Sequence, residues 1–287
     1  MGSTTHDNRA EHVVVVGSRG SKLALAQTNG VIAELRRANP GLDVRLTTVH
    51  TEGDLLLSAS LAQIGGTGVF VKEIEAALLA GTIDLAVHSL KDLPVRQPAG
   101  LRIGAICPRE DPRDVLISNH PGGLADLPEG ASIGTGSLRR RAQLLAYRPD
   151  LTIRDIRGNV DTRLRKLREG AYDAIALAAA GLKRLGYAVP DGGYLPFEVA
   201  LPAVGQGALA IEIRADDERL ARLVEPLDDA ASRAATQAEA AFLAAFGGGC
   251  AVPLGAYAEV SGDTITLQGM VASLDGRRLL RNQVTGR

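Results

Sequence analysis

The sequence predicts an α/β protein that has two similar, mostly parallel-sheet domains and a small α+β domain at its C-terminal end. Two observations predict the α/β domains: short apolar runs alternate with runs of helical periodicity through 12–105, and the alternation recurs through 113–200. Strands that alternate with helices imply parallel pairing with right-handed crossovers. After residue 230 the pattern changes to one helix followed by alternating strands, which predicts the third domain.

In the first domain, β-branched runs mark the strands, and the turn Asn39-Pro40-Gly41 ends the first helix. A glycine-rich loop at 65–68 precedes the second helix. The expected order is strand 12–16, helix 22–38, strand 44–49, helix 69–79 and strand 83–87.

The second domain begins its repeat at the loop Gly134-Thr135-Gly136-Ser137, which lacks the lysine and the spacing of a P-loop. The expected order is strand 132–133, helix 138–147, strand 151–156, helix 160–169, strand 174–177 and helix 179–185. We interpret the segments 107–112 and 201–207 as hinges on either side of this domain.

The apolar strand 208–214 is expected to return to the first domain, so that the chain crosses twice and leaves a cleft between the domains. An alanine-rich helix at 230–246 and strands near 255–260, 264–271 and 278–283 follow. The predicted domains are therefore 11–107 with 208–226, then 113–201, and finally 230–287.

Composition argues against several classes of protein. The 32 basic and 33 acidic residues nearly balance and aromatics make up only 3%, whereas a nucleic-acid-binding protein usually has excess positive charge and stacking rings. The N-terminus is polar and no apolar run is long enough to span a bilayer. The two cysteines form no disulfide framework, and no cluster has metal-ligand spacing. We expect a cytoplasmic protein without metal, membrane or nucleic-acid partners.

Hydroxyl, amide and cationic side chains follow nearly every expected strand, at the end where open α/β sheets bind ligands. Helix N-termini and guanidinium groups both favour anions. Such cations could also be solvated charges of helix faces, although that explanation weakens when five strand ends share the pattern. The candidates are Ser18, Arg19, Ser21, His88, Ser89, Lys91, Asp92, Thr135, Ser137, Arg139, Arg140, Arg157, Asn159, Arg163, Lys183 and Arg184.

Two further residues have reactive side chains in distinctive positions. Asp92 lies among cations and could stabilise a developing positive charge or move protons, or it could simply cap a helix. Cys250 follows three glycines, which would leave its sulfur accessible, although free cysteines are usually small buried hydrophobes. No histidine belongs to a recognisable Cys-His hydrolase motif, and we interpret Cys107, in the first hinge, as structural.

Nine segments, in order over nearly the whole chain, resemble the porphobilinogen deaminase (hydroxymethylbilane synthase) family. Each segment is weak evidence alone, but the ordered set is specific. The segments are SRGSKLALAQ (18–27), GGTGVFVKEIE (65–75), DLAVHSLKDLP (84–94), REDPRD (109–114), GTGSLRR (134–140), IRGNVDTRL (156–164), AGLKRLG (180–186), LPAVGQGA (201–208) and GGGCAVPLGAYA (247–258).

The resemblance implies two periplasmic-binding-protein-like, doubly wound α/β domains plus the small α+β domain, in a monomer. It implies a transferase of porphyrin and haem biosynthesis that joins porphobilinogen units head to tail, releasing ammonia, to form the linear tetrapyrrole hydroxymethylbilane. It implies a dipyrromethane cofactor attached through a thioether to Cys250, with Asp92 as the catalytic carboxylate. The residues implied to bind cofactor and substrate are Arg19, Ser21, Gln27, Lys91, Thr135, Ser137, Arg139, Arg140, Arg157, Arg163, Arg184 and Gln206.

The chain departs from the family pattern at three places. Thr67 stands where the family often has lysine, Gly136 stands where serine is usual, and the sequence ends at Arg287, where the family normally continues with a helix. Two other functions remain open at this point: a non-catalytic two-lobe protein that binds a small carboxylate, and a nucleic-acid-binding module that uses the run Arg139–Arg141, against which the overall charge argues.

Overall fold

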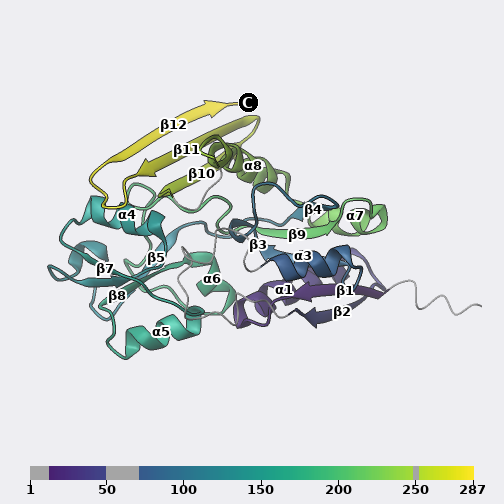
Figure 1. Cartoon of the computed structure of the whole chain (residues 1–287), viewed down its shortest axis with the longest axis horizontal. Helices are drawn as coiled ribbons and strands as arrows, with labels where there is room; N and C mark the ends of the chain where they lie inside the picture. The colour runs from purple at the N-terminus through teal and green to yellow at the C-terminus, as the bar shows by residue number, and fades with distance from the viewer. Residues whose placement is uncertain (1–12, 50–70, 248–251) are drawn as a thin grey trace, which may run out of the picture.

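Three sheets organise the protein in the computed structural model, which describes residues 13–49, 71–247 and 252–287. Figure 1 shows two α/β units side by side, with the third sheet and its helix above them. The predicted fold class of two α/β units and a small α+β unit is confirmed.

The first sheet has the strand order β2-β1-β3-β9-β4. Its core is aliphatic, and Val14, Val16 and Leu85 of the sheet pack against Val31 and Leu35 of helix α1. The strands are β1 (Val13–Ser18), β2 (Asp43–Thr48), β3 (Leu85–Ser89), β4 (Leu101–Ile106) and β9 (Leu209–Arg214), and the helices are α1 (Lys22–Ala38), α3 (Lys72–Leu79) and α7 (Glu218–Val224).

The second sheet has the strand order β5-β8-β6-β7. Ile133, Ala174 and Leu144 form one of its core clusters, and Ile156, Ile175 and Leu182 belong to the other. The strands are β5 (Asp114–Ser118), β6 (Ser132–Gly134), β7 (Thr152–Arg154) and β8 (Ala174–Ala178), and the helices are α4 (Leu138–Tyr147), α5 (Val160–Arg168) and α6 (Ala179–Arg184).

Both sheets are more mixed than the sequence pattern predicts. Strand β9 runs antiparallel to β3 and β4, and β5 runs antiparallel to β8, while the other pairs of these two sheets are parallel. The antiparallel strands flank the two segments by which the chain leaves and re-enters the first sheet. A strand that arrives from a neighbouring unit, instead of through a crossover helix, is free to pair in either direction.

The chain passes between the two units through two segments that contact each other, 107–113 and 201–208, which we call the connectors. Glu110 N donates to Gly207 O at 3.2 Å, and Arg109 Nε donates to Gln206 O at 2.9 Å. Lys22 of α1 also pairs with Asp161 of α5 at 3.1 Å, so the two units meet on the helix side as well.

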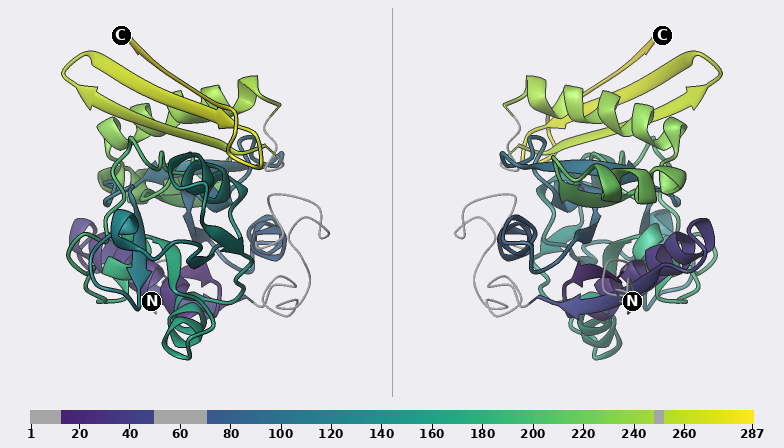
Figure 2. Two further views of the ribbon diagram at one scale, coloured as in Figure 1. Left: turned by 90° about the vertical axis from the view of Figure 1, so that its left-hand side faces the viewer. Right: turned by 90° about the vertical axis from the view of Figure 1, so that its right-hand side faces the viewer.

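The third sheet consists of three antiparallel strands, β10 (Leu254–Ser261), β11 (Thr264–Ala272) and β12 (Leu279–Gly286). Helix α8 (Ala230–Ala245) packs on β10 and β11, and Figure 2 shows it along one face of this sheet. The predicted helix 230–246 and three strands are therefore present in the expected order.

Candidate functional site

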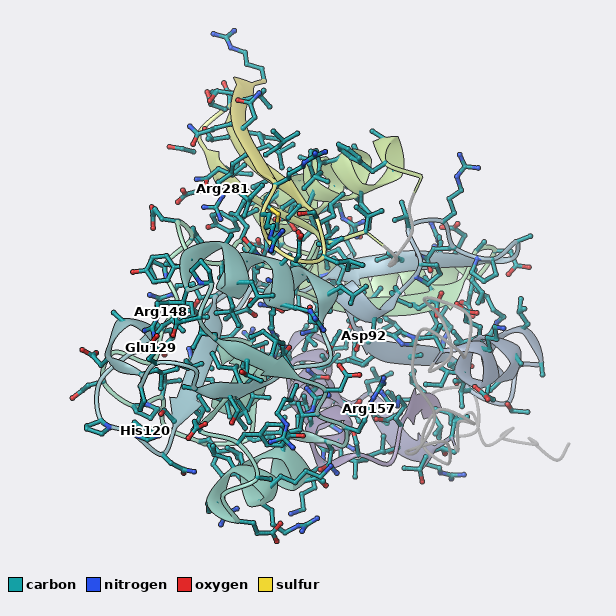
Figure 3. All side chains as sticks on the ribbon, turned by 60° about the vertical axis from the view of Figure 1, so that its left-hand side comes forward. Asp92, His120, Glu129, Arg148, Arg157 and Arg281 are labelled. Atoms are coloured by element: carbon teal, nitrogen blue, oxygen red, sulfur yellow. The ribbon has the colours of Figure 1, made fainter. Side chains whose placement is uncertain are left out.

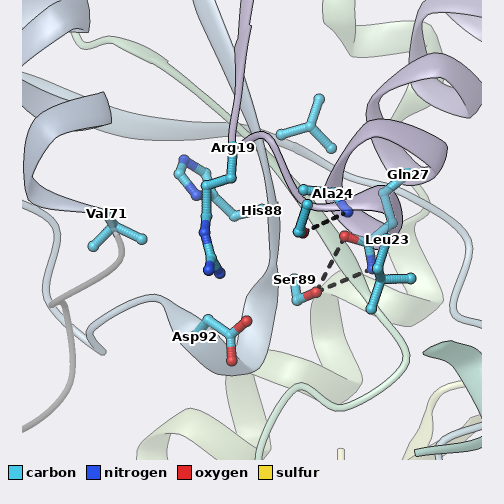
Figure 4. A pocket seen from close by; sticks show the side chains of 10 residues that line it. Arg19, Leu23, Ala24, Gln27, Val71, His88, Ser89 and Asp92 are labelled. Carbon is cyan, nitrogen blue, oxygen red and sulfur yellow. Dashed lines mark hydrogen bonds between the residues drawn. The ribbon is translucent and has the colours of Figure 1, made fainter. Parts of the chain in front are cut away.

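A pocket opens at the carboxyl end of β3, next to the start of α1. Ser21 is the N-cap of α1, and its Oγ accepts from Ala24 N at 3.2 Å. Gln27, in the second turn of α1, donates from Nε2 to Ser89 Oγ at 3.1 Å. The lining residues, shown in Figure 4, are Arg19, Ser21, Leu23, Ala24, Gln27, Val71, Val87, His88, Ser89 and Asp92.

Asp92 lies at the end of the short 3₁₀ turn η2 (Leu90–Asp92) that directly follows β3. Its side chain is exposed, and the guanidinium of Arg19 points toward it across the pocket (Figure 4). The predicted grouping of Arg19, Ser21, Gln27 and Asp92 is therefore present in one pocket.

A buried pair of ionisable side chains lies beside the pocket, and sequence reasoning singled out only one of them, His88. His88 Nε2 lies 3.2 Å from Glu212 Oε2, with both side chains almost completely buried. Burial, together with the charge of Glu212, raises the pKa of nearby Glu75. Alternation of Glu212 with apolar residues in β9 places it on a buried strand, but only the sheet pairing brings it to His88.

A second group of candidates surrounds the start of α4. Ser137 is the N-cap of this helix, and Thr135 Oγ1 accepts from Ser137 N at 3.2 Å. A Cβ at Gly136 would lie 3.5 Å from its nearest neighbour, the carbonyl oxygen of Ile156, which is an ordinary contact distance. The backbone here would therefore also accommodate the Cβ of the serine that is usual in the family.

Arg139 and Arg140 are buried and bind a carboxylate of the protein itself. Arg139 Nη1 donates to Asp114 Oδ2 at 2.6 Å and to Leu201 O at 2.5 Å, and Arg140 Nη2 donates to Asp114 Oδ1 at 2.7 Å. Burial alone would raise the pKa of Asp114, but the charges of both arginines and their hydrogen bonds hold it well below its usual range. The sequence interpretation placed these arginines at the ligand and gave no role to Asp114.

Lys91 and Gln206 extend this network across the connectors. Gln206 Nε2 donates to Asp114 Oδ1 at 2.8 Å, and its Oε1 accepts from Lys91 Nζ at 3.1 Å. Burial lowers the pKa of Lys91 to about 8, and the nearby carboxylates of Asp92 and Asp114 limit the decrease.

Arg157 and Arg163 lie at the start of α5, close to Arg140. Arg163 Nε donates to Gly158 O at 2.8 Å. Burial, and then the charges of Arg140 and Arg157, lower the pKa of Arg163 to about 10. The charges of Arg140 and Arg157 act on Arg163 in the same direction as burial, so the three guanidinium groups form a cationic cluster that could hold an anionic ligand. Figure 3 shows Asp92 and Arg157 in the central region where the two α/β units meet.

Of the remaining predicted residues, Arg184 contacts a connector. Arg184 Nη2 donates to Gly207 O at 2.6 Å, so this side chain supports a connector. Cys250 and Thr67 lie outside the described residues. In the described ranges, no helix is long and apolar enough to cross a membrane, and no three His, Cys, Asp or Glu side chains gather as metal ligands would.

Together, the fold and the site define a class: a two-unit α/β protein whose cations, contributed by both units, can hold a ligand that carries several carboxylates. The family model described as "Porphobilinogen deaminase, dipyromethane cofactor binding domain" matches residues 14–222, and the model of the porphobilinogen deaminase C-terminal domain matches residues 234–287.

Curated relatives agree with both matches. The porphobilinogen deaminase of Brevibacillus brevis is 54% identical over 94% of this chain and 88% of its own length. That of Geobacillus kaustophilus is 54% identical over 95% of this chain and 89% of its own length. Among solved structures, a periplasmic domain of Bordetella pertussis BvgS superposes with a TM-score of 0.42 at 14% identity, over 83% of this chain and 94% of that one.

The chain belongs to the porphobilinogen deaminase family. It is a transferase of porphyrin biosynthesis that condenses porphobilinogen units into hydroxymethylbilane, and residues 14–222 form its dipyrromethane cofactor binding domain. All the candidate binding residues, from Arg19 to Gln206, lie in that domain. The alternative of a non-catalytic binding protein is not favoured.

Proposed function

We propose that the cations of both α/β units bind the carboxylates of dipyrromethane and porphobilinogen, and that Asp92 is the catalytic carboxylate. The observation that carries this proposal is the cluster of Arg140, Arg157 and Arg163, in which burial and repulsion lower the pKa of Arg163 to about 10. Bound carboxylates would relieve that repulsion, and guanidinium groups can hold them through paired hydrogen bonds.

The roles of the pocket residues follow from the charges that the reaction develops. Each porphobilinogen carries two carboxylates, so the growing product gains negative charge with every unit, and cations spread over both units can follow it. Loss of ammonia leaves positive charge on the incoming pyrrole, which the exposed carboxylate of Asp92 can stabilise at close range. Arg19, which points toward Asp92, can bind a substrate carboxylate beside it.

The bound dipyrromethane would supply the pyrrole carbon to which the first substrate unit is joined. We assign its thioether to Cys250, because that residue occupies the position of the cofactor cysteine in the segment GGGCAVP. Cys107 is unsuited to this role: it is partly buried, and burial raises the pKa of its thiol to about 11, so little of the nucleophilic thiolate is present near pH 7.

The two crossings of the chain between the α/β units also suggest where its domains begin and end. We assign the domains as 11–107 with 208–226, 113–201 and 230–287, which follows the two crossings of the chain through the connectors. We also propose that the enzyme acts as a monomer in the cytoplasm, on a small-molecule substrate and without nucleic-acid or membrane partners.

Intact-protein mass spectrometry tests the cofactor assignment. The wild-type mass should exceed the sequence mass by one dipyrromethane, Cys250→Ser should lose this excess, and the matched control Cys107→Ser should keep it. A wild-type protein without the excess, which gains none on incubation with porphobilinogen, would contradict the proposed function. An excess that survives in Cys250→Ser would show that the attachment site is wrong.

A further inference from the structure

Asp114, the first residue of β5, is completely buried at the junction between the two α/β units. Its carboxylate accepts hydrogen bonds from Arg139 Nη1 at 2.6 Å, from Arg140 Nη2 at 2.7 Å and from Gln206 Nε2 at 2.8 Å. Both arginines come from α4 of the second unit, and Gln206 comes from the connector that returns to the first.

Through Gln206 this carboxylate is linked to Lys91, next to the catalytic candidate Asp92. Gln206 is buried, and its amide is fixed at both ends: Nε2 also donates to Pro112 O at 2.7 Å, and Oε1 accepts from Lys91 Nζ at 3.1 Å. One hydrogen-bonded chain therefore joins Arg139 and Arg140 in the second unit to Lys91 in the first.

The negative charge of Asp114 allows three cations to remain close together. Repulsion from Arg139 and Arg140 acts with burial to lower the pKa of Lys91, and the carboxylates of Asp92 and Asp114 oppose them. Arg140 also contributes to the lowered pKa of Arg163, so it belongs to both the Asp114 network and the cationic cluster. Its Nε has no hydrogen-bond partner among the described residues.

We propose that Asp114 is a positioning residue of the substrate site, which holds Arg140 directly and Lys91 through Gln206 so that cations of both units face the substrate carboxylates together. This role rests on the proposed carboxylate-binding function. Asp114 contacts neither substrate nor reacting atoms, and acts by fixing the place and charge of the side chains that do.

The test is to measure the titration of Lys91 itself. Purified holoenzyme is treated with a small amine-reactive acylating reagent across a pH series. The acylated peptide that contains Lys91 is then quantified by mass spectrometry. The wild-type midpoint should lie below that of an ordinary lysine. Asp114→Asn removes a charge that raises the Lys91 pKa, so its midpoint should fall. The alkaline limb of its pH–rate profile should move to lower pH in parallel, and its KM should rise about tenfold, as expected for loss of a charged, buried hydrogen bond.

Two variants make this test specific. Asp114→Asn combined with Gln206→Glu moves the negative charge one side chain closer to Lys91, and should bring the midpoint back to the wild-type value or above it. Asp111→Asn removes another carboxylate of the same connector, one that pairs with Arg113 at 2.6 Å, and should leave the Lys91 midpoint in place.

An unchanged midpoint in folded Asp114→Asn would overturn the proposal, and so would an equal shift in Asp111→Asn. If Asp114→Asn does not fold, Gln206→Met carries the test, because it cuts the link to Lys91 and leaves both arginine pairs intact; its midpoint should also fall. Failure of the substrate assignment is separable, since it appears as a missing cofactor mass in the wild type, whereas the Lys91 titration is read without turnover.

Discussion

Asp92 differs from the other carboxylates near the site in that its side chain is exposed at the pocket. Asp114, Glu212 and Glu239 are completely buried, and each has a cationic or histidine partner within 3.3 Å. A ligand in this pocket can therefore contact the carboxylate of Asp92 directly. The carboxylates of Asp114, Glu212 and Glu239 can influence the ligand only through the side chains with which they are paired.

Asp92→Asn should keep the cofactor but lose turnover. The amide preserves the size of the side chain and removes the charge that stabilises the developing cation, so kcat should fall by about a hundredfold or more. Steady-state assay of product formation measures the rate, and intact mass verifies that the cofactor is still attached. Asp263→Asn, in the exposed turn between β10 and β11, is the matched control and should retain wild-type turnover. Product formation by Asp92→Asn at a normal rate would exclude the assigned role.

The sequence predicted some residues of the site better than others. Strand-end positions placed Arg19 and Asp92 in one pocket correctly, because the site lies where the carboxyl ends of strands meet. The same rule assigned Arg139 and Arg140 to the ligand without recognising Asp114, which lies 25 positions before Arg139. Pairing between residues that far apart depends on the tertiary fold and leaves no local pattern.

At the scale of elements, the starts of the helices were predicted best. Helices were expected to begin at residues 22, 138 and 160, and α1, α4 and α5 begin there, after the N-caps Ser21, Ser137 and Asn159. The side chain of an N-cap accepts from a backbone N–H two or three residues further on, so its signal is local.

Strands β4 and β5 and helix α7 were not predicted, and each depends on distant partners. The ladder between β4 and β9 shifts register between Ile103 and Ala105, which breaks the alternation that marks a strand in sequence. Strand β5 begins with the buried charge of Asp114, which resembles a loop until its arginines are known. Helix α7, seven residues long, packs beside β4 and β9 and is too short for a clear helical period.

A buried ion pair fastens α8 and the third sheet to the connectors. Glu239 of α8 pairs with Arg109 at 2.5 Å, and its carboxylate also accepts from Gly205 N and Ala258 N, each at 2.8 Å. Glu239→Gln removes the countercharge of a buried guanidinium and leaves an NH₂ group where an acceptor is needed. We expect a loss of about 3–5 kcal/mol in the free energy of unfolding, because one buried charge is left without its partner.

Urea unfolding followed by circular dichroism measures this loss, with Glu34→Gln as the control. Glu34 pairs with Arg37 on the exposed face of α1, where both side chains are more than half exposed. Removal of that pair should cost about 1 kcal/mol or less. Equal shifts of the two unfolding midpoints would mean that the junction at Glu239 does not hold the third unit in place.

At the scale of the whole molecule, the two α/β units are joined where the connectors pass each other. Gly207 has φ +94°, and its carbonyl oxygen accepts from Glu110 N at 3.2 Å and from Arg184 Nη2 at 2.6 Å. A Cβ at this position would overlap the carbonyl oxygen of Glu110 in the other connector. The glycine is therefore required both by its left-handed backbone and by the close approach of the two connectors.

Gly207→Ala should destabilise the protein more than an equivalent change elsewhere and should also lower kcat/KM. Gly170 supplies the matched control, because it too has a positive φ, +75°, but a Cβ there would meet no atom within 4 Å. Gly170→Ala should cost only the left-handed backbone strain, about 1–2 kcal/mol, with kcat/KM unchanged. The additional loss in Gly207→Ala comes from separating the connectors, which moves Gln206 and Arg184 together with the backbone that they contact. Thermal unfolding and steady-state kinetics of both variants measure the difference. Equal losses of stability, with normal kcat/KM in both, would show that contact between the connectors is not what aligns the two halves of the site.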